Sequence, residues 1–215
     1  MRTKAILFDL DGVILDSEKV YRQFWLQAAE ELGLPLKEEE VLRLRSCDAS
    51  IAREIVDTAT GQAGAYDRIR ARRKGLMKEF LSEHTFELKP GVQSFLEKCR
   101  DLPVRKVIVT SSTPEEKMPA LERLGIGQYF DGFVSVKEVK RGKPFPDVYL
   151  IACSRLGLDP GECAAIEDSP NGVRSAYDAG VKVIMVPDLT GPTDDLRRMC
   201  RVADRIEEVL EYFHE

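Results

Sequence analysis

Lys4-Ala-Ile-Leu-Phe-Asp9-Leu-Asp11-Gly12 is a short apolar run that ends in two aspartates and a glycine. The run Lys4–Phe8 is typical of a buried β-strand. In open α/β sheets, ligands bind beyond the carboxyl ends of the strands. Side chains two positions apart on an extended segment share one face, so Asp9 and Asp11 can converge on one ligand. An isolated aspartate pair before a glycine is also common in turns, and the rest of the chain has to decide between these interpretations.

Similar apolar runs recur along the chain and alternate with helical patterns. The expected strands are Lys4–Phe8, Arg105–Val109, Gly132–Val136, Cys163–Ile166 and Val181–Val186. The expected helices are Gly91–Arg100, Glu115–Leu124, Asp147–Leu156, Asn171–Ala179 and Glu207–Phe213. Strands separated by helical crossovers predict an α/β fold, a doubly wound parallel sheet of Rossmann-like type with helices on both faces.

A long helical insertion interrupts this alternation. No strand pattern is present between Ser17 and about Lys89, whereas Val20, Phe24, Ala28 and Leu32 recur at helical spacing. The segment is too long for a simple crossover, so we expect an α-helical cap over residues 17–86 and a catalytic core over residues 1–16 and 87–215. A lid is the expected role. The basic run Arg68–Lys74 is interpreted as the solvated face of a cap helix, with nucleic-acid or membrane contact as the alternative.

Composition limits the classes of function. The 215 residues include 32 Lys+Arg and 37 Asp+Glu, a net charge of −5, which argues against a nucleic-acid binder. No apolar run approaches the roughly 18–20 residues that cross a membrane, and no signal peptide is recognisable. Five cysteines without a CxxC pair suggest neither disulfides nor a zinc site. We expect a cytoplasmic protein, a monomer or weak dimer, that binds neither nucleic acid nor membrane.

Acidic side chains also follow a later strand. Cys163–Ile166 leads into Glu167 and Asp168. Asp168 can join Asp9 and Asp11 around a hard cation with oxygen ligands, of which Mg²⁺ is the obvious case, with Glu167 in support. The competing interpretation of Asp168 is a helix N-cap.

Two further strand ends carry groups suited to phosphate. Thr110-Ser111-Ser112-Thr113-Pro114 leads from a strand into a helix, and helix N-termini present unpaired N–H groups to anions. Lys143, held between Gly142 and Pro144, can place a fixed positive charge on a phosphoryl oxygen. Plain helix capping and a solvated surface lysine are the alternatives for each motif alone. Four such motifs at successive strand ends make coincidence a poor explanation.

The ordered set resembles a known superfamily. Asp9-Leu-Asp11-Gly12, Thr110-Ser111-Ser112, Lys143-Pro144 and Glu167-Asp168-Ser-Pro-Asn-Gly172 resemble the four motifs of the haloacid dehalogenase-like hydrolases. More narrowly, the chain is similar to the phosphatase and β-phosphoglucomutase branch with a small helical cap. The resemblance spans nearly the whole chain and implies Mg²⁺-dependent phosphoryl transfer through an aspartyl-phosphate.

The resemblance also implies a role for each motif residue. Asp9 is the expected nucleophile, and Asp11 is the expected acid and base. Ser111, with Ser112 beside it, is expected to hold phosphoryl oxygens, and Lys143 to neutralise their charge. The expected metal ligands are Asp9, Asp11 and Asp168, with Glu167 in support.

The choice of reaction within the superfamily depends on a few positions. The dehalogenase and phosphonatase branches lack a carboxylate at the position of Asp11, which favours phosphate esters here. The mutase pattern has a histidine where this chain has Tyr21, and its cap loop is not reproduced around Arg43–Cys47. We therefore expect a phosphatase for a small phosphorylated metabolite such as a sugar phosphate. The alternatives are a β-phosphoglucomutase-type mutase and, more remotely, a phospho-acceptor signalling domain. Arg43, Arg45 and Tyr21 are candidate substrate contacts in the cap.

Overall fold

A six-stranded parallel sheet forms the core of the computed structural model, which describes residues 3–213. The strand order is β3-β2-β1-β4-β5-β6. The strands are β1 (Ala5–Phe8), β2 (Arg105–Thr110), β3 (Gly132–Ser135), β4 (Cys163–Glu167), β5 (Lys182–Met185) and β6 (Arg201–Val202). Because β1 lies between β2 and β4, the residues that follow these three strands meet at the same edge of the sheet.

Both faces of the sheet are covered, as expected for a doubly wound α/β fold. Along β1, Ile6 and Phe8 belong to one buried cluster and Ala5 and Leu7 to the other. Strands buried on both faces read as continuous apolar runs, which is the pattern that predicted them. The first cluster includes residues of α5 (Val92–Cys99), α6 (Pro114–Arg123) and the 3₁₀ helix η4 (Ile206–Phe213). The second includes residues of α7 (Asp147–Leu156), α8 (Pro170–Asp178) and α9 (Asp194–Met199). Short 3₁₀ turns complete the connections at η1 (Gly127–Tyr129), η2 (Val136–Glu138) and η3 (Pro160–Glu162).

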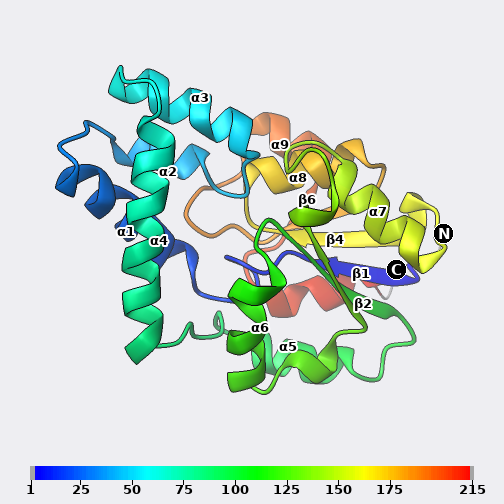
Figure 1. The fold of residues 1–215 in the computed structure, drawn as a ribbon. Coiled ribbons are helices and arrows are strands. Elements are labelled where there is room, and N and C mark those ends of the chain that lie inside the picture. Colours follow the sequence, from blue (N-terminus) through cyan, green and yellow to red (C-terminus); the bar gives the residue numbers. More distant parts are fainter. Residues whose placement is uncertain (1–2, 214–215) are drawn as a thin grey trace.

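An α-helical cap is inserted between β1 and β2. It comprises α1 (Glu18–Glu31), α2 (Glu38–Arg43), α3 (Ala49–Thr60) and α4 (Ala65–Glu83). Trp25 of α1 stacks on Tyr66 of α4 with ring centroids 5.9 Å apart, and Phe24 meets Phe80 edge to face at 5.7 Å. Figure 1 shows the four helices grouped beyond the carboxyl ends of the strands. Within the described range, no helix combines the length and apolarity needed to cross a bilayer.

The C-terminal elements differ from the sequence-based prediction. The two-residue strand β6 and the six-residue helix α9 were not predicted, because both are too short to show a readable hydrophobic period. The segment predicted as the helix Glu207–Phe213 forms the 3₁₀ helix η4 instead. The other predicted helices of the core agree with the structure to within one residue at each end.

Candidate active site

A buried lysine links the ends of three neighbouring strands. Lys143 Nζ lies 2.8 Å from Asp9 Oδ1 and 2.6 Å from Glu167 Oε1, and it donates to the Val109 carbonyl at 3.1 Å. Burial alone would lower the pKa of Lys143, but the charges of Asp9 and Glu167 raise it above its ordinary value. Lys143 is therefore a fixed cation between two carboxylates, not a solvated surface lysine.

Three carboxylates form a compact acidic cluster at this edge of the sheet. One oxygen each from Asp9, Glu167 and Asp168 lies within 4.8 Å of the others. Three carboxylate oxygens of this cluster are buried and have no hydrogen-bond partner among the described residues: Asp9 Oδ2, Glu167 Oε2 and Asp168 Oδ1. Burial raises the pKa of Glu167 to about 8 and that of Asp168 to about 7, although Lys143 and Arg45 act in the opposite direction. Unpaired buried carboxylate oxygens are costly, and a hard cation is their natural partner.

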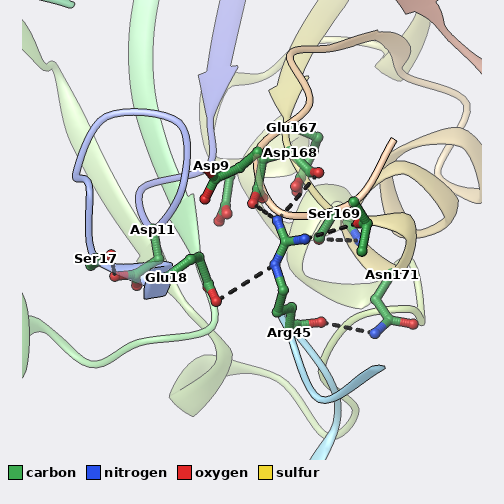
Figure 2. Close-up of polar contacts among 12 residues, drawn as sticks. Asp9, Asp11, Ser17, Glu18, Arg45, Glu167, Asp168, Ser169 and Asn171 are labelled. Carbon is green, nitrogen blue, oxygen red and sulfur yellow. Dashed lines mark hydrogen bonds and ion pairs between the residues drawn. The ribbon is translucent and has the colours of Figure 1, made fainter. Parts of the chain in front are cut away.

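A cap arginine reaches into this cluster. Arg45, in the loop between α2 and α3, pairs with Asp168, and its Nε lies 3.6 Å from Glu18 Oε2. Figure 2 shows the Arg45 guanidinium between these two acids. Asn171 Nδ2 donates to the Arg45 carbonyl at 2.8 Å, which fixes the loop from the core side.

The site contains more acidic than basic side chains. Asp9, Glu18, Glu167 and Asp168 face the two cations Lys143 and Arg45. If all four acids ionise, two negative charges remain uncompensated. The pKa of Glu18 is raised to about 8, mainly by burial and secondly by the charge of Asp168, as expected for an acid in such a cluster. A single divalent cation would balance the excess.

The Asp11 carboxylate lies outside the compact cluster. It accepts hydrogen bonds from the hydroxyls of Ser17 and Ser112, the latter at 2.8 Å, and pairs with Lys117 of α6. Lys117 is fully buried, with its Nζ 4.8 Å from the Tyr21 ring centroid. Burial would raise the pKa of Asp11, but Lys117 and the hydroxyls outweigh it and hold the pKa below the usual value. Asp11 is consequently ionised.

The hydroxyls after β2 are not equivalent. Thr110 Oγ1 accepts the Ser112 N–H at 3.0 Å, and the Ser112 hydroxyl is occupied by Asp11. Ser111 Oγ is buried and, within residues 3–213, has no hydrogen-bond partner. Of these three hydroxyls, that of Ser111 is available to a ligand.

The cap closes over the site along the loop that carries Lys143. The Asp48 N–H donates to the Lys143 carbonyl at 2.6 Å, and the Gly142 N–H donates to Asp48 Oδ2 at 2.7 Å. A cavity of about 810 Å³ remains between cap and core, lined by Asp11 and Ser111 among others. Tyr21 and Arg45 also line this cavity, whereas Arg43 is exposed and does not.

Three contributors to the site were not identified from the sequence. Glu18, the first residue of α1, directly follows the loop that carries Asp9 and Asp11, so the local run of acids was a usable signal. Lys117 and the fully buried Tyr149, whose hydroxyl donates to Glu167, lie within helices. No local pattern distinguishes a helical residue that faces a site from one that faces a core.

Gly172 makes room for one of the acids. A methyl group at this position, in the first turn of α8, would overlap the Glu167 carboxylate. We expect Gly172→Ala to displace Glu167 and to destabilise the protein by about 1–3 kcal/mol, because the closely packed site cannot expand freely. Denaturant unfolding would measure this loss. Gly161→Ala is the matched control, since a methyl group there meets no atom within 4 Å. Equal stability of the two variants would contradict the expectation.

Comparisons with known proteins agree with this geometry. A family model described as haloacid dehalogenase-like hydrolase matches residues 6–186. The phosphorylated carbohydrates phosphatase of Thermotoga maritima is 31% identical over 84% of this chain and 83% of its own length. The β-phosphoglucomutase of Bacillus subtilis is 30% identical over 85% of this chain and 83% of its own. A hydrolase from Pseudomonas syringae shares the fold with a TM-score of 0.84 at 20% identity, over 99% of this chain and 98% of that one.

Proposed function

Because the chain belongs to the haloacid dehalogenase-like hydrolase family, we propose that it is a Mg²⁺-dependent phosphatase for a small phosphorylated metabolite such as a sugar phosphate. We propose that the reaction passes through a phosphoaspartate on Asp9. The observation that carries the proposal is the environment of the two carboxylate oxygens of Asp9. One of its carboxylate oxygens is held by Lys143, and the other is buried without a partner in the described structure.

Asp9 is suited to attack phosphorus with the unpartnered oxygen. Lys143 fixes the carboxylate through Oδ1, which leaves Oδ2 to form the bond. The Ser111 hydroxyl would donate to a phosphoryl oxygen, and Lys143 would offset the negative charge that gathers as the bond forms. Asp11 is ionised in the free protein, so it would first take up the proton of a monoanionic phosphate ester as the ester binds, and it would then pass this proton to the leaving oxygen.

Asp11 would carry the proton in both half-reactions. It would pass the proton taken up from the substrate to the leaving alkoxide in the first and, ionised again, would take a proton from the water that hydrolyses the phosphoaspartate in the second. Its contact with Lys117 favours the ionised form, which is the form that activates water.

The acidic cluster fits a divalent cation on its own geometry. Asp9, Glu167 and Asp168 would hold it, because the unpartnered oxygens of Glu167 and Asp168 and the excess negative charge of the cluster both favour binding of a hard cation, while Asp9 Oδ2 is kept for the bond to phosphorus. When bound, Mg²⁺ would neutralise charge on the phosphoryl group and on Asp9. Asp11 was also predicted from the sequence as a metal ligand, but its carboxylate pairs with Lys117 and lies outside the acidic cluster, so we assign it to proton transfer instead.

The acidic cluster predicts a link between pH, Mg²⁺ and stability. The unfolded chain releases the protons of Glu18, Glu167 and Asp168 near pH 4, whereas the folded protein without metal holds them up to about pH 7–8. The free energy of unfolding of the metal-free protein therefore falls as the pH rises from about 4 to about 8. Mg²⁺ binds the ionised carboxylates, so we expect it to raise the melting temperature more at about pH 8 than at about pH 5.

Thermal unfolding with and without millimolar Mg²⁺ would check this expectation, with Asp168→Asn as the variant that loses the effect. An increase in melting temperature that is as large at the acidic pH, or that persists in Asp168→Asn, would contradict the metal site.

The cap would exclude water and shape the substrate pocket. We propose residues 17–86 as the moving cap, because Arg45 and Asp48 join it to the core beside the reacting groups. Contacts at that boundary break when the cap opens, which would admit substrate and release product.

Phosphate release from a panel of sugar phosphates in the presence of Mg²⁺ would test the proposed function. The wild type is expected to release phosphate and the Asp9→Asn variant to release none. Identical absence of release in both proteins would refute the phosphatase. Isomerisation of a hexose phosphate, stimulated by glucose 1,6-bisphosphate while phosphate release stays slow, would favour the mutase instead.

A further inference from the structure

The cavity between cap and core extends well beyond the phosphoryl site. It runs from Asp11 and Ser111 to the helix α4, and its volume of about 810 Å³ exceeds what one phosphoryl group fills. Eight basic and five acidic side chains line it. The acids already have partners: for example, Glu116 pairs with Lys74 at 3.5 Å, and Glu115 pairs with Lys137 at 2.9 Å. The uncompensated charge of the cavity is therefore positive.

Arg73 is the most unusual of the basic residues. Its guanidinium carbon lies 4.8 Å from the Trp25 ring centroid and 5.1 Å from that of Tyr21. Its Nε is buried without a partner, and no hydrogen bond or ion pair reaches this side chain from elsewhere in residues 3–213. Its neighbour Arg72, by contrast, pairs with Glu31.

The two aromatic rings fix the guanidinium but leave its N–H groups unused. Cation–π contact attracts the charge to the ring faces and accepts none of the in-plane hydrogen bonds. Arg73 is half-buried, and its buried Nε–H is costly to leave without a partner unless an acceptor arrives. The planar fork matches a carboxylate or a phosphate, either of which it can bind through two parallel hydrogen bonds.

Arg73 also lies close to the reacting groups. The Tyr21 ring centroid is 5.1 Å from Arg73 and 4.8 Å from Lys117 Nζ, and Lys117 pairs with Asp11. One aromatic ring and one ion pair thus separate Arg73 from the proposed acid and base. Asp11, Ser111 and Arg73 line the same cavity, so a small molecule with its phosphate beside Asp11 and Ser111 can present a second group to Arg73.

We propose that Arg73 binds a second anionic group of the substrate, a carboxylate or a second phosphate, and thereby selects phosphate esters that carry one. This inference rests on the proposed function and adds a substrate class to it. Arg73 acts as a specificity-determining residue, since it contacts the part of the substrate that does not react.

Matched substrate pairs test the proposal. One pair is 3-phosphoglycerate and glycerol 3-phosphate, which differ by a carboxylate, and the other is fructose 1,6-bisphosphate and fructose 1-phosphate, which differ by a phosphate. We expect the wild type to favour the doubly anionic member of at least one pair in kcat/KM, and the favoured pair identifies the anion. Arg73→Met should reduce that ratio by about 30-fold or more, the usual effect of truncating one partner of a buried charge pair.

Arg72→Met is the control, because Arg72 is on the same helix, pairs with Glu31 and does not line the cavity. It should leave the ratio unchanged. A wild type without preference in either pair, or an Arg73→Met variant that lowers kcat/KM equally for both members, would overturn the proposal.

Binding measurements separate this inference from the phosphatase itself. Calorimetric titration of the Asp9→Asn protein and of its Arg73→Met double variant with the same four compounds needs no turnover. Loss of selective binding in the double variant supports the Arg73 subsite. If hydrolysis is never observed in that case, the phosphatase proposal fails and the subsite proposal does not. Binding that does not distinguish the members of either pair refutes the subsite even if all four compounds are hydrolysed.

Discussion

Asp9→Asn is expected to lower kcat for phosphate release by about 10⁴-fold or more, because an amide cannot serve as the nucleophile. The substitution preserves the shape of the side chain and an oxygen that accepts from Lys143, so the fold should survive. Steady-state phosphate release measures the effect, and circular dichroism verifies the fold.

Asp178→Asn provides the matched control, since it makes the same chemical change on the exposed end of α8 and should leave kcat unaltered. An Asp9→Asn protein that retains substantial turnover would mean that the phosphoryl group is transferred elsewhere.

Lys143→Met should lower kcat by about 10²–10³-fold, the usual cost of removing one preorganised charge from a reaction centre. It should also destabilise the metal-free protein by about 3–5 kcal/mol at alkaline pH, because Asp9 and Glu167 would then face each other without their shared cation. Without Lys143 the pKa values of both acids rise further. The loss of stability should therefore be smaller near pH 5, where Glu167 is protonated, and grow as the pH rises past about 8.

Denaturant unfolding at both pH values, alongside the kinetics, would check this expectation. Lys98→Met, an exposed position on α5, is the control. A loss of stability that does not depend on pH would show that Lys143 contributes packing and not charge.

The sequence was most informative where strands end. Asp9, Lys143 and Asp168 were predicted to meet because each follows, or lies in a loop beside, a strand of one parallel sheet. The central position of β1 between β2 and β4 does bring them together. The geometry of a parallel sheet supplies this information without knowledge of any side-chain contact.

Residues on helices were harder to place. Arg68–Lys74 was interpreted as a solvated face, and Arg72 does pair with Glu31 near the surface, yet Arg73 turns into the cavity. Adjacent helical residues point about 100° apart, so a run of like charges cannot occupy one face. Arg45 was a candidate substrate contact, and its partners in the structure are Asp168 and Glu18. The docking of the cap on the core decides such contacts, and no local pattern encodes it.

Mass spectrometry of acid-quenched protein during turnover addresses the phosphoaspartate itself. With p-nitrophenyl phosphate, whose leaving group departs without a proton, the Asp11→Asn variant should accumulate it, because the base that activates water is absent from the second half-reaction. We expect a mass gain of one phosphoryl group on the peptide that contains Asp9, in the wild type transiently and in Asp11→Asn at higher occupancy. Continued phosphate release with no adduct on Asp9 in either protein would contradict the mechanism.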